Sequence, residues 1–337
     1  MPRMLRASRT SALAALLLLT AGPLAPATTA TAAPPAAAST AVVSAAVSYP
    51  RYGQTSSAVR SLQNQLIAAG QLKAELNTGY FGSQTRTAVR AVQKKYKLST
   101  TGTVNAATMA AIKKAVAAAT GPPTWYHSET IGTSAEGRAI KAYRAGQAGK
   151  PVVMVLATMH GEENFGQYVA RGLLEGRKIA DVDLWVVPVL NPDGLVRDRR
   201  WVNGSIDLNR NFPHRFIKRA NSGPKASSAK ETRVVMKFLD RVNPKYVVSW
   251  HQPLYGVDTY GVKDKGLMNR LASGLKMPKR SLDCHGSCHG TMTGWFNAHH
   301  KGAAITVEYG YTARSMKTMK GRDADAVLKA IGGKRVG

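Results

Sequence analysis

Residues 152–163 read VVMVLATMHGEE, and this stretch determines how we interpret the larger part of the 337-residue chain. Residues 152–159 are valine-rich and almost entirely apolar, as a strand buried on both faces of a sheet requires. The polar sequence His160-Gly161-Glu162-Glu163 follows at once. A buried strand that runs directly into ionisable residues predicts a functional site at the carboxyl end of a sheet.

Further short apolar runs occupy residues 184–190, 246–250 and 303–307. They alternate with segments of helical periodicity, so we predict an α/β domain over residues 125–337, with a mixed central sheet flanked by helices. Two of the runs end directly at His251 and Glu308. Because the carboxyl ends of parallel strands share one edge of a sheet, we expect these two residues to lie near His160.

The residues at this edge are suited to hold one zinc ion. A His and a carboxylate three residues apart lie on the same side of a helical turn, so His160 and Glu163 can reach one ion. His251 is the candidate third ligand, which leaves a coordination position open for water. Glu162 is an alternative to Glu163, although the helical spacing favours Glu163. No His-Glu-x-x-His sequence occurs in the chain.

The first residues of the chain have the pattern of an export signal. Arg3, Arg6 and Arg9 precede the apolar run 12–19, and Ala30-Thr31-Ala32 offers a small-x-small cleavage site. We therefore predict a signal peptide over residues 1–32, followed by an Ala- and Pro-rich linker over residues 33–47. The apolar run is too short for a stable transmembrane anchor, so we expect a secreted protein associated with the cell wall.

Residues 48–118 have the periodicity of a small all-α domain, with expected helices near residues 58–66, 85–96 and 105–118. The segment carries Leu62-Gln63 and Val92-Gln93 pairs, and Tyr80-Phe81-Gly82 lies between them. In these features it resembles the peptidoglycan-binding type 1 module. A generic three-helix bundle is the alternative. Residues 119–124, which include Pro122 and Pro123, are the expected linker to the α/β domain.

The α/β domain resembles the carboxypeptidase A-like zinc carboxypeptidases, in the murein peptide amidase branch. The matching elements, in chain order, are His160-x-x-Glu163, Asn191-Pro192-Asp193-Gly194, Arg200, Asp207-Leu208-Asn209-Arg210, His251 and Thr306-Val307-Glu308. The resemblance implies that His160, Glu163 and His251 bind zinc. It also implies that Glu308 takes a proton from the attacking water and passes it to the leaving amine.

The same resemblance implies roles for four further residues. Arg200 would stabilise the oxyanion, and Asn209 and Arg210 would bind the free carboxylate of the substrate. Asp207 would orient the first zinc-binding histidine. An internal ion pair between Asp207 and Arg210 is the structural alternative.

The expected substrate pocket departs from that of the digestive members of the family. Gly286 occupies the position of their mobile tyrosine, so Tyr255 or Tyr260 are candidates to replace it. Thr293 occupies the position that sets preference for the terminal side chain. Its small polar side chain fits neither a deep apolar pocket nor an acidic pocket for basic residues.

The chain is strongly basic, with 47 Lys and Arg against 19 Asp and Glu. For an exported protein this excess predicts binding to anionic cell-wall polymers. We see no recognition motif for nucleic acid and expect no nucleic-acid partner. Cys284 and Cys288 predict a local disulfide in an oxidising compartment. A second metal site that uses these cysteines and the histidines beside them is the alternative.

These observations predict a secreted zinc carboxypeptidase or amidase that hydrolyses an amide bond in peptidoglycan stem peptides, its N-terminal module bound to peptidoglycan. The resemblance suggests the bond between γ-D-Glu and diaminopimelate. A general extracellular carboxypeptidase and a deacylase of the aspartoacylase or succinylglutamate desuccinylase kind are alternative enzymes. A non-catalytic wall-binding protein is the third alternative.

Overall fold

The computed structural model describes residues 48–73, 76–119, 121–284, 288–312 and 314–337. The predicted signal peptide and the linker after it lie outside the described residues. Among the described residues, no helix is long and apolar enough to cross a membrane.

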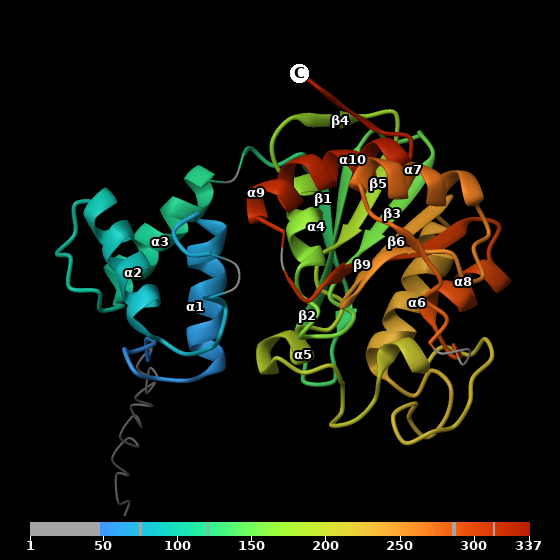
Figure 1. Ribbon diagram of the computed structural model, residues 1–337, viewed down its shortest axis with the longest axis horizontal. Helices are drawn as coiled ribbons and strands as arrows, with labels where there is room; N and C mark the ends of the chain where they lie inside the picture. Colours follow the sequence, from blue (N-terminus) through green and yellow to red (C-terminus); the bar gives the residue numbers. More distant parts are fainter. Residues whose placement is uncertain (1–47, 74–75, 120, 285–287, 313) are drawn as a thin grey trace, which may run out of the picture. The chain divides into compact units, whose positions relative to one another are not determined.

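The N-terminal segment is helical, as its periodicity predicted (Figure 1). Helices α1 (Ser57–Ala68), α2 (Ser83–Lys95) and α3 (Ala106–Ala119) enclose a small apolar core. That core is made of fully buried side chains such as Leu62, Leu66, Phe81, Val92 and Ile112. The expected helices are confirmed, with ends that differ by a few residues.

Two buried glutamines hold the turns of this helical segment in the same way. Gln63 on α1 accepts from Gly79 N at 2.8 Å and donates to Tyr80 O and to Thr85 Oγ1. Gln93 on α2 accepts from Gly102 N at 2.8 Å and donates to Thr103 O and to Thr108 Oγ1. Each amide therefore satisfies backbone groups of the following turn and the first turn of the next helix.

The remaining chain forms an α/β domain, as predicted. Its described strands form an eight-stranded sheet in the order β1-β2-β5-β3-β6-β9-β7-β8, and β10 pairs with β4 separately. Strands β5, β3, β6 and β9 are mutually parallel, whereas β1, β2 and β7 are antiparallel to their inner neighbours. The four apolar runs found in the sequence are these four central strands. The strands are β1 (Trp125–Thr133), β2 (Ala139–Gly146), β3 (Val152–Leu156), β4 (Lys178–Ala180), β5 (Asp183–Val187), β6 (Tyr246–His251), β7 (Leu254–Asp258), β8 (Lys279–Arg280), β9 (Ala303–Gly310) and β10 (Lys334–Val336).

Helices cover both faces of the sheet, and the side chains of each strand alternate between two cores. Val153 and Val155 of β3 belong to one core, and Met154 and Leu156 belong to the other. The helices of this domain are α4 (Gly166–Leu174), α5 (Pro192–Arg197), α6 (Lys230–Val242), α7 (Lys265–Leu275), α8 (Met292–His299), α9 (Met316–Thr318) and α10 (Ala324–Ala330), with a 3-10 turn at Leu208–Arg210 and a π-helical turn at Met319–Asp323.

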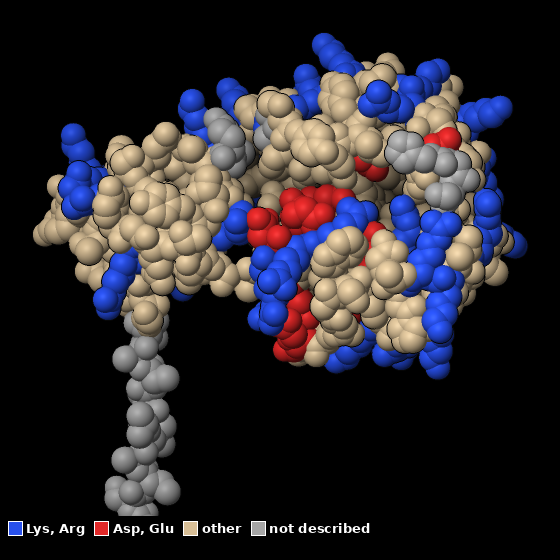
Figure 2. Space-filling model, turned by 60° about the horizontal axis from the view of Figure 1, so that its bottom comes forward, with Lys and Arg blue, Asp and Glu red and all other residues tan. Residues whose placement is uncertain are grey.

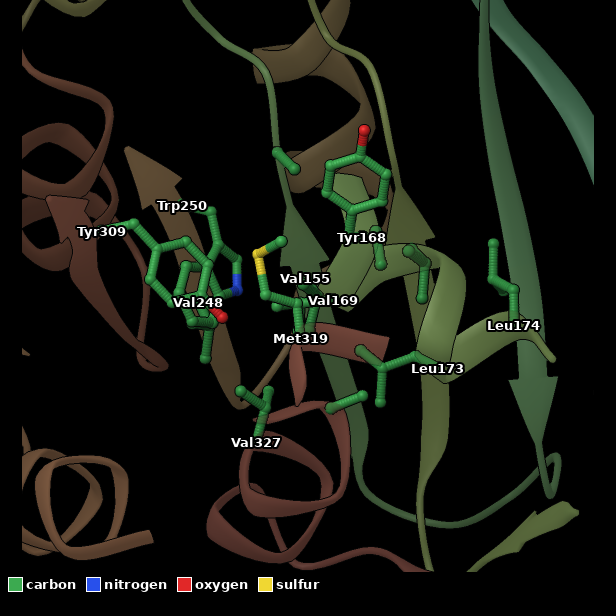
Figure 3. Close-up of a cluster of buried hydrophobic side chains, with 14 of the residues drawn as sticks. Val155, Tyr168, Val169, Leu173, Leu174, Val248, Trp250, Tyr309, Met319 and Val327 are labelled. Atoms are coloured by element: carbon green, nitrogen blue, oxygen red, sulfur yellow. The ribbon is translucent and has the colours of Figure 1, made fainter. Parts of the chain in front are cut away.

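The core that includes α4, α7 and α10 packs on one face of the central strands. Figure 3 shows Tyr168, Val169 and Leu173 of α4 beside Val155, with Trp250 and Tyr309 from β6 and β9 next to each other. The rings of Trp250 and Tyr309 have centroids 4.5 Å apart. The other core contains residues of α6 and α8. Because both faces are covered, the carboxyl ends of the central strands are the accessible edge.

The glutamine arrangement generates a prediction for the helical segment. In Gln93→Leu the apolar side chain has a similar volume, but Gly102 N and Thr103 O lose their partner. An unsatisfied buried group costs ~1–3 kcal/mol, so amide exchange in the turn should accelerate roughly 5- to 150-fold. Hydrogen–deuterium exchange of residues 99–108 in the full chain measures this change.

The exposed Gln84 on the same helix provides the control, because Gln84→Leu removes no described hydrogen bond. Its exchange in residues 99–108 should match that of the unchanged chain. Equal exchange in Gln93→Leu and Gln84→Leu would show that the buried amide does not hold the turn.

Candidate metal centre and substrate cavity

The register of the sheet brings His251 and Glu308 to one place. Strands β6 and β9 are parallel neighbours, and His251 pairs directly with Glu308. Strand β3 lies on the other side of β6, and the loop after it carries His160 and Glu163. All four residues line one cavity, so the expected convergence at the carboxyl ends of the strands is what the structure shows.

The segment that carries His160 and Glu163 is not the helical turn that their spacing suggested. It is an irregular loop, and α4 begins only at Gly166. The backbone N–H of Glu163 donates to His160 O at 3.2 Å, so a tight turn brings the two side chains together in place of a helix. That part of the prediction was wrong, although both residues still face the same point.

The loop takes this shape because it packs backbone against backbone on the Asn191-Pro192-Asp193-Gly194 turn. A Cβ on Gly161 would lie 1.9 Å from the carbonyl carbon of Gly194, so only glycine fits there. Gly161 N–H donates to Arg199 O, and Asn191 N–H donates to Thr158 O. The turn at residues 191–194 therefore shapes the loop, and none of its residues lines the cavity.

His160, Glu163 and His251 form a buried group whose possible ligand atoms all lie within 4.8 Å of one another. Glu163 lies between the imidazoles: Oε1 is 2.8 Å from His160 Nδ1, and Oε2 is 3.0 Å from His251 Nδ1. Among the described residues, His160 Nδ1 is buried without a hydrogen-bond partner. A buried nitrogen that points at a carboxylate but forms no hydrogen bond fits a metal ligand, and two imidazoles with one carboxylate suit zinc.

The ring nitrogens that face away from this group have their own partners. His160 Nε2 lies 2.9 Å from Asp207 Oδ1, and His251 Nε2 lies 3.0 Å from Ser249 Oγ. Such contacts fix the orientation and tautomer of a ligating imidazole. Sequence reasoning assigned Asp207 to this position but missed Ser249, which lies two residues earlier on the same strand.

Asp207 connects the metal-binding group with the polar groups beside it. Its carboxylate also accepts from Arg200 Nε at 2.9 Å and from Asn209 N at 2.8 Å. Burial by itself would raise the pKa of Asp207, but the nearby His160 and Arg200 lower it below its ordinary value. The expected alternative, an ion pair between Asp207 and Arg210, is absent among the described residues, whose ion pairs at Asp207 join it to His160 and Arg200.

Arg200 reaches the metal-binding group itself. Its Nη1 donates to Glu163 Oε1 at 2.6 Å, so one guanidinium bridges Glu163 and Asp207. Its side chain is 29% exposed and lines the cavity, so the remaining N–H groups are accessible to a substrate. A planar guanidinium held on two carboxylates is well placed to stabilise developing negative charge.

Asn209 and Arg210 line the same cavity. Asn209 Oδ1 accepts from Met292 N at 3.0 Å, an orientation that leaves its Nδ2 as the donor. Arg210 donates to Asn209 O at 2.7 Å and lies 3.3 Å from Cys284 Sγ. Burial lowers the pKa of Arg210, so this guanidinium is partly desolvated. Both residues are therefore positioned to bind a carboxylate.

Glu308 faces the metal-binding group from β9. Its Oε2 accepts from Leu254 N at 2.8 Å, which holds the side chain in place. Burial raises the pKa of Glu308 above its ordinary value. A carboxylate with a raised pKa is a better proton acceptor and, once protonated, a usable proton donor.

Cys284 and Cys288 are joined in a disulfide with a Cα–Cα distance of 4.9 Å. Bonded sulfurs leave no thiolates for the alternative metal site. Gly286 lies outside the described residues. Of the two candidate tyrosines, Tyr260 lines the cavity and its hydroxyl accepts from Arg215. Tyr255 lies outside this cavity, and its hydroxyl accepts from Arg314.

Other residues of the cavity were not found by sequence reasoning. Thr293 lines it, as expected, but so do His214, Asp258 and His289. His289 is buried, and its Nδ1 has no hydrogen-bond partner among the described residues. His214 and Asp258 come from segments without a recognisable motif, and His289 was considered only for the alternative metal site beside the cysteines, so only the fold brings them to this cavity.

Comparison with known families agrees with this geometry. Residues 111–254 match the zinc carboxypeptidase family, and residues 55–112 match the peptidoglycan binding domain family. The first match includes the three candidate metal ligands and ends before Glu308. The chain therefore contains a zinc carboxypeptidase domain, the domain of a metallopeptidase, preceded by a peptidoglycan-binding domain.

The chain is also similar to individual proteins and to solved structures. The chain is 26% identical over 225 residues to bacteriocin BCN5 of Clostridium perfringens, which covers 59% of this chain and 25% of the relative. It is 30% identical over 144 residues to murein peptide amidase A of Escherichia coli K12, which covers 38% of this chain and 60% of the relative. The matches therefore span less than two thirds of these relatives. The crystal structure of a murein-tripeptide amidase from Escherichia coli O157 has a similar fold, with a TM-score of 0.51 and 22% sequence identity. The superposed region covers 63% of this chain and 92% of the amidase chain.

The site generates a prediction about metal retention. Glu163→Gln removes the carboxylate between the two imidazoles, so zinc affinity should fall by more than the ~10- to 100-fold that loss of an orienting partner outside the ligand set causes. Zinc content after dialysis against a graded series of competing chelators, measured by mass spectrometry, gives the affinity.

Glu162→Gln is the matched control, because Glu162 is adjacent in the chain but is not part of the metal-binding group. It should retain zinc as the unchanged protein does. Loss of zinc in Glu162→Gln with retention in Glu163→Gln would assign the ligand to Glu162 instead.

Proposed function

We propose that the chain is an exported zinc-dependent carboxypeptidase or amidase that cuts an amide bond next to a free carboxylate in peptidoglycan stem peptides. The observation that carries this proposal is the content of one cavity. A His-Glu-His group, Glu308, Arg200 and the Asn209–Arg210 pair all line it. The bond we favour joins γ-D-Glu to diaminopimelate, because murein peptide amidase A is among the similar proteins.

Zinc, when bound by His160, Glu163 and His251, would acidify water and polarise the scissile carbonyl as a Lewis acid. The chain's own residues account for the rest of the reaction. Asn209 Nδ2 and the Arg210 guanidinium bind the free carboxylate and so orient the peptide. Arg200 donates to the oxygen on which negative charge develops, a contribution typically worth roughly 100- to 1,000-fold in rate.

Glu308 moves the proton that hydrolysis requires. Its carboxylate accepts a proton from the attacking water and then donates it to the amine that leaves. Burial, which raises its pKa, makes this carboxylate a better proton acceptor in the first of these steps, and the proton it then holds is available for the second. The register of β6 and β9, which pairs Glu308 with His251, places this carboxylate beside the metal-binding group.

The assignment to the cell wall depends on the N-terminal part of the chain and on charge. The peptidoglycan-binding domain supports a wall substrate, and the pattern of residues 1–32 supports export. Figure 2 shows Lys and Arg around much of the visible outline, with Asp and Glu confined to a few places. Such a basic surface favours binding to the anionic polymers of a wall.

The other candidate functions fit less well. A non-catalytic wall-binding protein would lack a ligand or the proton-transfer group, and none is missing from the cavity. A deacylase for soluble metabolites has no use for a peptidoglycan-binding domain. A general extracellular carboxypeptidase would use the same chemistry, so only a comparison of substrates distinguishes it from our proposal.

The first test separates metal binding from hydrolysis. In Glu308→Gln the zinc content should equal that of the unchanged protein, whereas release of products from purified muropeptides should fall by at least ~100-fold, because proton transfer of this kind contributes ~100- to 10,000-fold. Mass spectrometry follows the products, with ordinary peptides ending in a free carboxylate as parallel substrates. Release from ordinary peptides alone would contradict the wall-peptide assignment, and no release from any of them by the zinc-loaded protein would contradict the enzymatic one.

The second test concerns the peptidoglycan-binding domain. A chain that begins at residue 121 should hydrolyse soluble muropeptides within about twofold of the rate of residues 48–337. On intact sacculi it should be at least ~10-fold slower, because a tethered domain raises the local substrate concentration. If removal of the domain changed the rate on soluble muropeptides and the rate on sacculi by the same factor, the domain would not direct the enzyme to the wall.

A further inference from the structure

The cavity extends well beyond the metal-binding group. Its volume is about 910 Å³, large enough for a substrate side chain as well as the scissile bond. A further part of its wall is formed by the end of β7, by residues 280–283 and by Thr293, Asn297 and Thr306. Its chemistry determines which residue can follow the scissile bond.

Asp258, the last residue of β7, lines this part of the cavity and is only 8% exposed. Its Oδ1 accepts from Tyr260 N at 2.8 Å and from Leu282 N at 3.0 Å, so the orientation of the carboxylate is fixed. Burial raises the pKa of Asp258, and these backbone amides lower it.

This buried carboxylate has no cationic partner. Among the described residues Asp258 takes part in no ion pair, and the charged group that most affects it is a second acid, Asp283. The other strongly buried carboxylates that we have described, Glu163 and Asp207, both pair with Arg200 and a histidine. A buried charge normally pairs with an opposite charge, so an unpaired one on a cavity wall indicates that the ligand supplies the cation.

We propose that Asp258 determines the specificity of the cavity by binding the side-chain ammonium of the substrate residue whose carboxylate is held by Asn209 and Arg210. The substrate class is then a peptide or amide that ends in a diamino acid, such as lysine or diaminopimelate. This inference is built on the proposed hydrolytic function and names its substrate. Thr293 had argued against an acidic pocket, but Thr293 lies on α8, whereas the acid comes from the end of β7.

The charges of the cavity are complementary to such a residue. Arg200 bridges Glu163 and Asp207 beside the metal-binding group, where a carboxylate of the substrate is expected, and Asp258 lines the cavity at the end of β7. Arg280, its partner across β7 and β8, donates to Leu254 O and forms no ion pair with Asp258 among the described residues. A diamino acid carries a carboxylate at one end and an ammonium at the other. The chain as a whole is strongly basic, so its overall composition does not account for a buried acid in the substrate cavity.

Asp258→Asn tests the charge without disturbing the turn. The amide oxygen of Asn can still accept from Tyr260 N and Leu282 N, so the position of residues 280–282 is preserved. The zinc-loaded full chain and this variant are compared on γ-D-Glu-L-Lys and γ-D-Glu-L-norleucine, whose side chains differ only in the ammonium group. The unchanged protein should prefer the lysine substrate in kcat/KM.

In Asp258→Asn, kcat/KM for the lysine substrate should fall roughly 10- to 100-fold, as loss of a hydrogen bond between charged groups predicts. For the norleucine substrate it should stay within about twofold. The control Asp283→Asn removes the same charge from the neighbouring, less buried acid and should change the lysine rate less than about threefold. No preference in the unchanged protein, equal losses on both substrates, or equal effects of the two variants would overturn the proposal.

A binding measurement keeps this test separate from the hydrolytic proposal. Calorimetry with free L-lysine and free L-norleucine reports the same pocket without any reaction. If no γ-D-Glu substrate is hydrolysed, the proposed function fails, but tighter binding of lysine that is lost in Asp258→Asn still supports the role of Asp258. Equal affinity of the unchanged protein for both amino acids overturns it.

Discussion

The buried carboxylate of Asp207 joins the parts of the active site. It contacts His160 of the metal-binding group, accepts from Arg200, which bridges to Glu163, and accepts from the backbone of Asn209. Because one carboxylate fixes all three, the metal-binding group and the groups that would bind substrate cannot move independently. The free-energy cost of burying the Asp207 carboxylate is offset by the cationic and N–H groups around it. These residues therefore form one connected polar unit inside an apolar domain, and Glu308 faces that unit from β9.

The sheet provides the second constraint. Pairing of β6 with β9 in parallel places His251 beside Glu308, and the loop after β3 reaches the same edge. Apolar side chains on both faces of these strands hold the register, because a shift by one residue would exchange the two cores. The chemistry of the site thus depends on packing outside the cavity, including the contact between Trp250 and Tyr309, the chain neighbours of His251 and Glu308.

The centre of the cavity has the residues that are typical of the family, whereas other residues of its lining lie outside the family motifs. The metal-binding group, the proton-transfer carboxylate and the arginines explain how an amide bond could be cut. Asp258, Tyr260 and His289 have no counterpart in those motifs, and they line the same cavity. In the function that we propose, the basic surface and the peptidoglycan-binding domain would determine where the enzyme is held and not which bond it cuts.

Much of this could be predicted from sequence because the signals were local. The central strands were visible as short apolar runs, the helical domain as periodic Leu-Gln and Val-Gln pairs, and His160, His251 and Glu308 as polar residues at strand ends. Helical spacing was the wrong reason for pairing His160 with Glu163, since Gly161 packs on Gly194 and converts that segment into a loop. Contacts between loops distant in sequence leave no periodic trace. For that reason only the tertiary structure decided that Asp207 also pairs with Arg200, that Ser249 contacts His251, and that Asp258, an acid without an ion pair among the described residues, lines the cavity.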